Sequence, residues 1–401
     1  MSVLAVERSA WRALFAAQIG WMLDAMDFLL FTFAIVLIQK EFALSSATMG
    51  GLTSVALIAG AAGGIAFGKF ADAVGRVRAL TISILFYSLA TAGLATSQTL
   101  WQLIAWRVLV GFGMGGEWSA GSVLVAETWP AEHRAKAMGI MQSGWAIGAL
   151  IAAALSALIL GRFGWRVLFL IGALPAVAAF FIRRTVEEPP LWTQRKREPS
   201  RWSEMFSRVF ISRTVIATLL SSSVLVAYWG VMTWLPAFLA SPIEKGGAGL
   251  TVTKSAAWLI LLQVGAFFGY VTFGWFADRF GRRPAFTFFM ICAAALVPLF
   301  AFGARSKWTL LTLGPLLGYF AHGYFSIFGA VLAELFPTRF RASAQGFCYN
   351  AGRLASSAAP FAIGAAAQRH GLGSAIAVDA LFFLVAAVLI WFLPETKGAE
   401  L

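Results

Sequence analysis

Charged residues are scarce in this chain. Asp, Glu, Lys and Arg together make up 12% of its 401 residues, whereas 60% are hydrophobic and the mean hydropathy is +0.79. So few polar side chains cannot cover the surface of a folded chain of this length with groups that water solvates. The composition therefore excludes a water-soluble globular protein and predicts a protein of the membrane.

Cysteine and histidine are also rare, with two and three residues respectively. Cys292 and Cys348 fall in different apolar runs, and no CxxC pair or Cys/His cluster lies near either of them. The sequence also lacks a GxSxG serine and an HExxH pair. We therefore expect no disulfide framework, no bound metal, no cofactor and no enzyme activity.

Long apolar runs recur along the chain. They are long enough for helices that cross a hydrocarbon core about 30 Å thick, and they lack the alternation of barrel strands. We assign twelve such runs, at residues 12 to 38, 48 to 70, 79 to 98, 101 to 127, 136 to 160, 165 to 183, 211 to 239, 253 to 276, 286 to 303, 308 to 334, 341 to 367 and 373 to 393. The first run is too long for a cleaved signal peptide and holds two aspartates. The predicted fold class is an all-α membrane protein with twelve transmembrane helices.

The chain repeats its own plan in two halves. GKFADAVGRVRAL at 68 to 80 returns as GWFADRFGRRPAF at 274 to 286, an offset of 206 residues. A second pair, GMGGEWSAGSVLVAETWP and AHGYFSIFGAVLAELFP, aligns Glu127 with Glu334 at an offset of 207. Parallel repeats of this length predict two pseudo-symmetric six-helix bundles. We place the bundles at 1–183 and 211–401, joined by a polar, Pro-bearing cytoplasmic linker at 184–210.

The positions of Lys and Arg set the expected orientation. Basic residues gather in the linker and in the loops on the side of the two termini, so the positive-inside rule places both termini in the cytoplasm. We expect a bacterial-type inner membrane. The net charge of +13 is densest in the linker, where contact with lipid headgroups accounts for it better than nucleic acid does. No nucleic-acid partner is therefore expected.

Several motifs of the chain resemble those of a known family. The repeated Gly-x-x-x-Asp-x-x-Gly-Arg loop, Arg107 with Gly111, Gly113 and Gly115, and the closing PETKG at 394 to 398 resemble the major facilitator superfamily. WMLDAMDFLLFTF, GMGGEWSAGSVLVAETWP and YNAGR resemble in particular its sialate and monocarboxylate proton symporters. The seventh run, SSSVLVAYWGVMTWLP, lacks the Asn, His and Asp motif of Jen-type lactate carriers. The resemblance implies an alternating-access carrier that binds its substrate between the two halves.

Two aspartates lie within the first apolar run. Asp24 and Asp27 are three residues apart, so a helix projects both from roughly the same face. An ionisable group inside a membrane costs roughly 2.5 to 3.5 kcal/mol on insertion scales, so each one needs a reason to be there. Two neighbouring carboxyl groups can bind and release a proton as a pair, which a proton-coupled carrier requires. The alternative is that one of them pairs with an arginine as a structural contact.

Arg107 and Glu117 lie on roughly the same side of the fourth span. The resemblance pairs Arg107 with a first-span acid such as Asp27, so that a proton arriving on the acid would release the arginine. Glu117 is predicted to be a second proton site or a substrate contact. Its alternative role is a protonated glutamate that locks helix packing.

The second half contributes a single mid-span arginine, Arg353, whose counterpart in the first half is Ala146. A carboxylate substrate would satisfy this buried guanidinium with a bidentate pair, which predicts an organic anion as substrate. The alternative is an interhelical pair with Asp27 or Glu117. Further candidate substrate ligands are His322, Asn350, Tyr349, Gln142, Gln263, Tyr228 and Tyr324. Asp379 is expected near the outer end of the last span, at the membrane interface.

The repeated loops predict a cytoplasmic gate. Asp72 and Asp278 stand at helix ends beside Arg76 and Arg282, where carboxylate and guanidinium groups can bridge neighbouring helices. The resemblance adds Glu127, Arg134, Glu334 and Arg341 to the same network. It also implies that the network is closed in the outward-facing state and broken in the inward-facing one.

These features together predict a proton-coupled symporter of a small organic anion, such as a sialate- or lactate-like monocarboxylate, that works as a monomer in contact with membrane lipid. A sugar-type or aromatic-acid carrier of the same superfamily is the alternative. A non-transporting membrane receptor is the rival from another class. It is disfavoured because we expect a signalling domain or a long tail in a receptor.

Overall fold

The computed structural model describes residues 6–195, 201–243, 247–250, 252–303 and 306–401. Over these ranges the chain folds into helices joined by short turns, without a β-strand. The predicted all-α membrane fold is confirmed. Ten helical segments are long and apolar enough to cross a membrane.

The first half contains six helices. They are α1 (Arg8–Glu41), α2 (Ser46–Val74), α3 (Arg76–Leu94), α4 (Leu100–Thr128), α5 (Arg134–Ile171) and α6 (Pro175–Thr185). The backbone is non-helical at Gly164, where φ is 77°, and this break separates the predicted fifth and sixth spans. Positive φ costs an L side chain energy but not glycine, so the break falls at this residue.

The linker and the second half follow. The linker holds α7 (Pro190–Arg195) and the 3₁₀ turn η2 (Trp202–Phe206). The second half consists of α8 (Ile211–Ala240), α9 (Val252–Phe280), α10 (Arg282–Gly303), α11 (Lys307–Gly323), α12 (Phe325–Leu335), α13 (Arg341–Ser356), α14 (Ala359–His370), α15 (Leu372–Asp379), α16 (Leu381–Leu389) and η4 (Ile390–Phe392). The division into domains at 183 and 211 stays a prediction.

Three spans predicted as single helices are interrupted in the second half. The tenth is broken at Tyr324, the eleventh between α13 and α14, and the twelfth at Ala380. The eleventh therefore falls short of a single membrane-spanning helix, while the segment Arg134–Thr185 covers two predicted spans. One candidate segment thus corresponds to two predicted spans, and one predicted span has no candidate segment. These two differences account for ten candidate segments against twelve predicted spans.

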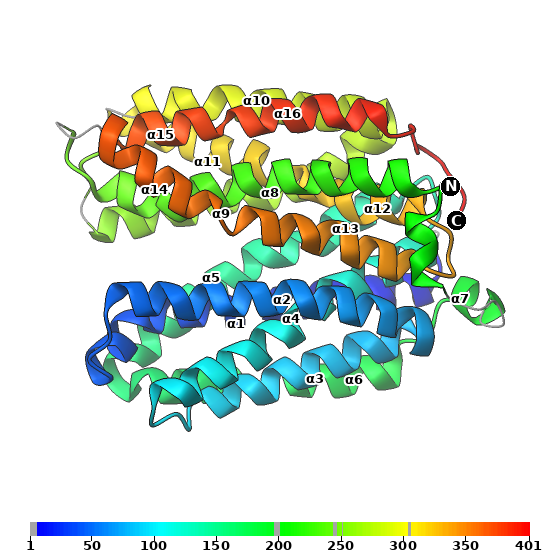
Figure 1. Cartoon of the computed structure of the whole chain (residues 1–401), viewed down its shortest axis with the longest axis horizontal. Coiled ribbons are helices and arrows are strands. Elements are labelled where there is room, and N and C mark those ends of the chain that lie inside the picture. Colours follow the sequence, from blue (N-terminus) through cyan, green and yellow to red (C-terminus); the bar gives the residue numbers. More distant parts are fainter. Residues whose placement is uncertain (1–5, 196–200, 244–246, 251, 304–305) are drawn as a thin grey trace.

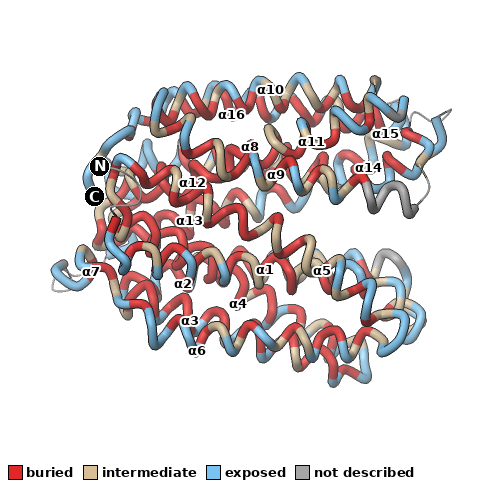
Figure 2. The backbone as a smooth tube through the Cα atoms, turned by 180° about the vertical axis from the view of Figure 1, so that it is seen from behind, coloured by how far each residue is buried: buried red, intermediate tan, exposed pale blue. Residues whose placement is uncertain are grey.

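The two halves lie side by side as separate bundles, with the chain ends next to each other at one end of the molecule (Figure 1). Buried residues concentrate inside each bundle and along the face between them, and the outward faces are more exposed (Figure 2). Many large apolar side chains are exposed, among them Phe361 at 83% exposure and Trp101 at 76%. Lipid tails can cover such side chains in a membrane.

Glycine allows the second and fourth helices of each half to pack closely. A Cβ atom at Gly63 of α2 would stand 1.9 Å from the carbonyl oxygen of Phe112 in α4. In the other half, a Cβ at Gly265 of α9 would stand 2.0 Å from the carbonyl oxygen of Pro315 in α11. Backbone against backbone leaves no room for any side chain, so both helix pairs depend on these small residues.

We expect Gly63→Ala to destabilise the protein, because the new methyl group must push α2 and α4 apart, at a cost of roughly 1 to 3 kcal/mol. Gly51→Ala in the same helix is the matched control. A Cβ at Gly51 meets no atom within 4 Å, and alanine is a better helix former than glycine. Thermal unfolding in detergent should show a lower midpoint for Gly63→Ala alone. Equal midpoints for the two variants would contradict the packing argument.

Candidate functional site

Three carboxyl groups are buried together in the first half. Asp24 and Asp27 of α1 are 4% and 3% exposed, and Glu117 of α4 is fully buried. Asp24 interacts electrostatically with both Asp27 and Glu117. Glu117 lies against α1 at Gly20, where a Cβ atom would meet its Oε1. The structure therefore brings the three predicted acids into one cluster at the α1/α4 contact.

Most oxygens of this cluster lack a hydrogen-bond donor. Within the described ranges, Oδ1 of Asp24, Oδ1 of Asp27 and both oxygens of Glu117 have no partner. Thr91 of α3 donates a hydrogen bond to Oδ2 of Asp27. Buried carboxyl oxygens without donors are costly as anions, so a cluster of this kind is suited to holding protons.

Arg107 of α4 does not form an ion pair with Asp27 in this structure. Its guanidinium stacks on the ring of Phe31, 3.8 Å from the ring centre, and its Nε has no hydrogen-bond partner among the described residues. Asp27 still attracts Arg107 electrostatically. The resemblance implied a pair between Arg107 and Asp27. In the structure Arg107 makes a cation–π contact with Phe31 instead, and Asp27 accepts its hydrogen bond from Thr91.

Arg353 of α13 approaches the first half. A Cβ atom built on Gly60 of α2 would stand 3.5 Å from Nη1 of Arg353. The guanidinium of Arg353 also interacts electrostatically with Asp24. Its guanidinium also lies 5.7 Å from the ring centre of Tyr349 and interacts electrostatically with that side chain. A cation of one half thus faces a carboxyl group of the other. The alternative to a carboxylate substrate was an interhelical pair of Arg353 with Asp27 or Glu117, but the acid that interacts with Arg353 in the structure is Asp24.

An aromatic stack joins the halves beside Arg353. The rings of Trp118 and Tyr349 are 3.9 Å apart between centres and inclined by 22°. Trp118 donates a hydrogen bond of 3.0 Å from Nε1 to Oε1 of Gln142. Two predicted substrate ligands, Tyr349 and Gln142, are therefore linked through a tryptophan that the sequence reading did not select. Its only signal there was its place directly after Glu117.

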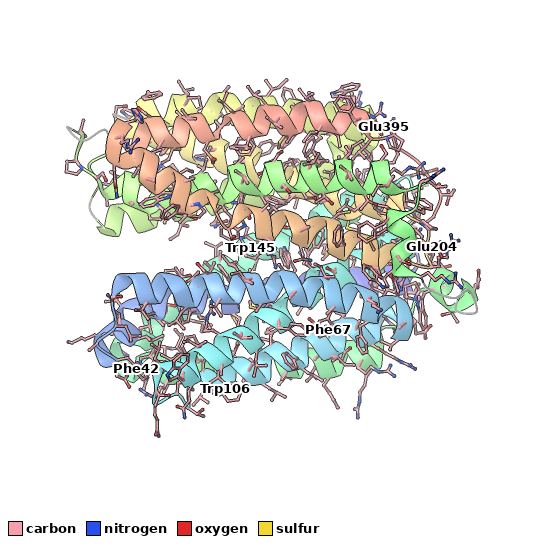
Figure 3. All side chains as sticks on the ribbon, in the orientation of Figure 1. Phe42, Phe67, Trp106, Trp145, Glu204 and Glu395 are labelled. Atoms are coloured by element: carbon pink, nitrogen blue, oxygen red, sulfur yellow. The ribbon has the colours of Figure 1, made fainter. Side chains whose placement is uncertain are left out.

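A second aromatic contact crosses between the halves. Phe28 of α1 lies 6.2 Å from Trp145 of α5 and 6.0 Å from Trp229 of α8, measured between ring centres. Trp145 lies near the boundary between the two bundles (Figure 3). Trp145 also interacts with the side chain of Tyr228, a predicted ligand of the second half.

His322 is buried and makes two hydrogen bonds. Its Nδ1 is 3.1 Å from the carbonyl oxygen of Gly318, and its Nε2 is 3.2 Å from the hydroxyl of Tyr228. A carbonyl can only accept, so Nδ1 carries the proton and Nε2 of the neutral ring accepts from Tyr228. His322 and Tyr228 therefore form a satisfied pair that positions the tyrosine.

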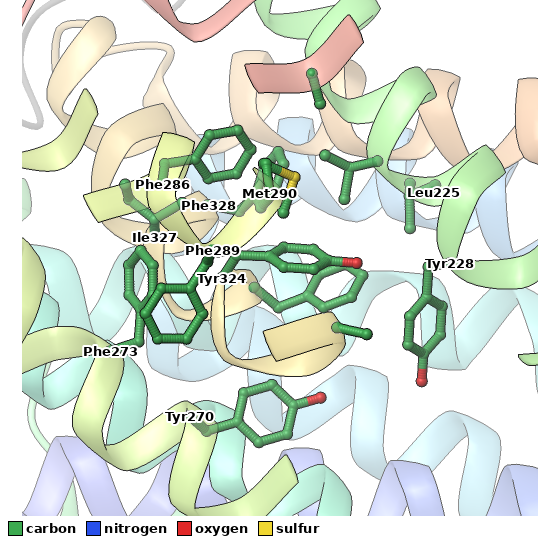
Figure 4. Packing of buried hydrophobic residues seen from close by; sticks show 14 of the residues in the cluster. Leu225, Tyr228, Tyr270, Phe273, Phe286, Phe289, Met290, Tyr324, Ile327 and Phe328 are labelled. Atoms are coloured by element: carbon green, nitrogen blue, oxygen red, sulfur yellow. The ribbon is translucent and has the colours of Figure 1, made fainter. Parts of the chain in front are cut away.

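The remaining predicted ligands have separate surroundings. Tyr324 belongs to the aromatic core of the second half, with Phe286 6.1 Å and Phe383 6.0 Å away (Figure 4). Asn350 donates to the carbonyl of Gly346 within its own helix. Gln263 of α9 is partly buried, and its Oε1 has no partner in the described part of the chain.

The predicted gate residues meet at the end of the molecule that carries the termini. Glu127 accepts from Arg76 of its own half at 2.9 Å and from Arg341 of the other half at 2.7 Å. Glu334 repeats the arrangement with Arg282 at 3.1 Å and Arg134 at 2.8 Å. Each glutamate therefore holds one guanidinium from each half.

Two aspartates complete this network by capping helices of the opposite half. Asp72 of α2 accepts from the backbone N–H groups of Ala342 and Ser343, at 3.2 Å and 2.8 Å, at the start of α13. Asp278 of α9 accepts from the backbone N–H of Lys136 at the start of α5, at 3.3 Å. A carboxylate at a helix N-terminus is stabilised by the unpaired N–H groups and the helix dipole.

Comparison with known proteins identifies the chain. The family model described as Major Facilitator Superfamily matches residues 15–256 and 245–400. The chain belongs to this superfamily. It is 34% identical to a putative metabolite transport protein of Haemophilus influenzae, over 99% of each chain, and 33% identical to a probable 4-methylmuconolactone transporter of Cupriavidus pinatubonensis, over 96% of this chain and 91% of the other. It is therefore a membrane transporter and not an enzyme.

More distant relatives agree. The sialic acid transporter NanX of Escherichia coli is 28% identical over 94% of this chain and 93% of its own. The fold matches that of the proton:xylose symporter XylE with a TM-score of 0.81, at 20% identity, over 98% of each chain. The superfamily resemblance read from the motifs is confirmed, together with the architecture of twelve helices in two bundles.

The structure of this transporter adds a pair of helix caps that the motif analysis missed. Glu188 accepts from the N–H groups of Val77 and Arg78 at the start of α3, both at 3.1 Å. Glu395 accepts from those of Arg282 and Arg283 at the start of α10, at 2.9 Å and 3.0 Å. The two glutamates are 207 residues apart, so the repeat offset was the signal that could have found them.

Glu395 follows the last membrane helix at the exposed end of the molecule (Figure 3). Burial alone would raise the pKa of Glu395, but the hydrogen bonds that it accepts from backbone N–H groups lower the pKa below its ordinary value. The cap therefore contributes stability when ionised and loses that contribution as the pH falls through its lowered pKa.

We expect Asp72→Asn to loosen the contact between the halves at this end, because a neutral amide cannot replace a carboxylate at the start of α13. A loss of 1 to 3 kcal/mol would change the ratio of closed to open forms roughly 5- to 150-fold. Spin labels at the exposed positions Arg78 and Arg279, in a background without native cysteines, should report longer distances.

The control is Glu41→Gln. Glu41 pairs with Arg166 at 2.6 Å within the first half, on partly exposed side chains, and does not bridge the two bundles. This variant should leave the distance distribution unchanged. An unchanged distribution in Asp72→Asn as well would rule out the gating role of the aspartate.

Proposed function

We propose that this transporter is a proton-coupled symporter of a small organic anion, moving its substrate into the cell across a bacterial-type inner membrane. The observation that carries the proposal is the cluster of buried carboxyl groups in one half facing a guanidinium of the other. Asp24, Asp27 and Glu117 supply the acids, and Arg353 supplies the cation. Coupled transport of a proton and an anion requires at least one binding site for each, close enough to influence one another.

The coupling follows from the charges. While Asp24 is ionised, it attracts Arg353 and competes with any other anion for that guanidinium. A proton on Asp24 removes the competing charge, so Arg353 is free to form a bidentate pair with a carboxylate substrate. Substrate binding is thus favoured by prior protonation, and by linkage the bound substrate favours protonation to the same degree.

The ion pairs around Glu127 and Glu334 close one end of the transporter. That end carries both termini and the basic linker, so we assign it to the cytoplasm. The conformation is then one in which the cytoplasmic side is shut. Arg341 and Arg134 must leave their glutamate partners in the opposite half for the substrate to exit. We take the working unit to be a monomer embedded in lipid.

The named substrates of relatives support a small organic molecule as cargo. NanX is named for sialic acid, which is a carboxylate, and another relative for 4-methylmuconolactone. An aromatic acid is the second candidate, favoured by the stack of Trp118 on Tyr349 next to Arg353. A planar ring can pack on such side chains while its carboxylate meets the guanidinium. Thermal-shift screening with sialate, lactate and benzoate, each at two pH values, would separate these classes.

Arg353 should determine affinity for the anion. Arg353→Lys keeps the charge but loses the planar fork, so affinity should fall by one to two orders of magnitude, or roughly 1.4 to 2.8 kcal/mol. Arg353→Ala should abolish binding. Isothermal calorimetry with the anion found by screening measures both, and circular dichroism checks the fold. If Arg353→Ala binds as tightly as the parent protein, the residue is a structural contact and Arg107 or His322 becomes the candidate ligand.

Asp24 should determine coupling. Asp24→Asn mimics the protonated residue, so substrate counterflow in proteoliposomes should persist while accumulation driven by a pH gradient is lost. Asp27→Asn is expected to act in the same direction, because the two carboxyl groups share one cluster. Glu41→Gln is again the control, since its pair with Arg166 is partly exposed. Gradient-driven accumulation at the parent rate in both aspartate variants would exclude these acids as the coupling site.

A further inference from the structure

A fourth buried carboxyl group lies in the second half, outside the cluster described above. Asp379 ends α15 and is 5% exposed. The sequence placed it at the membrane interface, but the structure buries it between helices instead. Its Oδ2 has no hydrogen-bond partner in the described ranges, and Asp379 forms no salt bridge with a residue described there.

The carboxyl group of Asp379 rests on the backbone of α8 at Gly230. A Cβ atom at Gly230 would stand 2.2 Å from Oδ2 of Asp379 and 2.6 Å from Cδ1 of Ile363. Glycine is therefore what admits the carboxyl group to this position. At this contact the carboxyl group meets a helix backbone and an aliphatic side chain, neither of which can supply a countercharge.

The first half contains the same contact with the roles exchanged. Asp27 of α1 lies against Gly172, which directly follows α5 within the predicted sixth span, where a Cβ atom would stand 2.7 Å from its Oδ1. The repeat offset of 207 carries Gly172 onto Asp379, and the offset of 206 carries Asp24, one turn before Asp27, onto Gly230. Each half thus buries a carboxyl group against a glycine between its first and last helices.

The other titratable groups around Asp379 do not neutralise it. Tyr324, at the junction of α11 and α12, interacts with it electrostatically, and its hydroxyl has no described partner. The basic residues of the helices packed on α15 lie toward helix ends. They are Arg213 in α8, Arg282 and Arg283 in α10, and Arg369 and His370 in α14.

We propose that Asp379 is a proton-binding site of the second half, distinct from the acids of the first. An ionised carboxylate against a glycine backbone, with no cation near it in a membrane interior, is strongly disfavoured. Asp379 therefore holds its proton while α15 rests on Gly230. It releases the proton when α15 and α8 separate and water reaches the carboxyl group. The site is independent of substrate identity and of Asp24.

Infrared spectroscopy of the purified protein tests the proposal directly. A protonated carboxyl group has a carbonyl stretch separate from that of a carboxylate and shifted by deuterium exchange. At neutral pH, Asp379→Asn should remove part of this band, while Glu187→Gln, at an exposed position, should not. Circular dichroism and counterflow verify that the variants fold. An undiminished band in a folded Asp379→Asn protein would overturn the proposal.

Gly230→Ala provides a second measurement should Asp379→Asn fail to fold. The added methyl group must displace the carboxyl group, so the part of the band that belongs to Asp379 should fall several-fold at neutral pH. Asp379→Ala with Gly230→Ala has no carboxyl group to displace and only the end of Ile363 to move, so it should recover part of the thermal stability lost in Gly230→Ala alone. A Gly230→Ala band equal to that of the parent would show that contact with α8 does not hold the proton.

Transport measurements then separate this site from the function proposed above. Counterflow by the parent should decline at alkaline pH as Asp379 loses its proton, and Asp379→Asn should lack that part of the decline. Asp24→Asn should retain it. If Asp379→Asn and the parent decline identically, Asp379 does not exchange its proton during transport. That result would leave the roles of Asp24 and Arg353 untouched.

Discussion

The cost of a charge in surroundings that water cannot reach governs this structure. A guanidinium or carboxylate inside the membrane is tolerated only with a partner, a proton or an aromatic face. The buried ionisable groups among the described residues differ in which of these they have. Glu127 and Glu334 hold two guanidiniums each, Arg107 lies on Phe31, and the oxygens of Glu117 have no described partner at all. When such a protein changes conformation, its buried charged groups must exchange one partner, proton or aromatic contact for another.

The charged residues of the two halves match at the end of the molecule with the termini, but they differ toward the middle of the helices. At the end with the termini, each half supplies the same glutamate, the same arginines and the same capping aspartate, and each reaches into the other half. Toward the middle of the helices the halves differ, with acids in the first and Arg353 in the second. Symmetric contacts suit a closure that both halves share. Asymmetric ones allow a proton and an anion to bind at different places.

The buried carboxyl groups of the two halves illustrate how symmetry and difference coexist. Asp27 and Asp379 occupy matching interfaces, but the acid belongs to the first helix in one half and to the last in the other. In each half the carboxyl group lies against a glycine, but Gly230 aligns with Asp24 and not with Asp27, so the two contacts are about one helical turn out of register. A repeat can therefore preserve a contact while its residues exchange positions, which an alignment of the halves by residue type does not reveal.

Some features of the protein follow from its sequence alone. Composition and long apolar runs require helices in a membrane, because free backbone amides in hydrocarbon must be satisfied within the segment. The repeated loops imply two like bundles, and the motif resemblance named the charged residues that meet at the end of the molecule with the termini. The interruptions at Tyr324 and Ala380 were not predicted, since short apolar segments read as one run whether or not the helix is continuous.

Tertiary structure alone decided which groups meet. Nothing in the spacing of Asp24, Asp27 and Arg353 says which acid faces the arginine, because that depends on the rotation of α1 and α13 and on the packing at Gly60. The contacts of Trp118 with Tyr349 and of Asp379 with Gly230 likewise depend on how the helices are rotated and packed. Periodicity determines the face of a helix on which a residue lies. Contact across helices is set by how the two bundles dock, and that depends on many weak packing contacts that no local motif encodes.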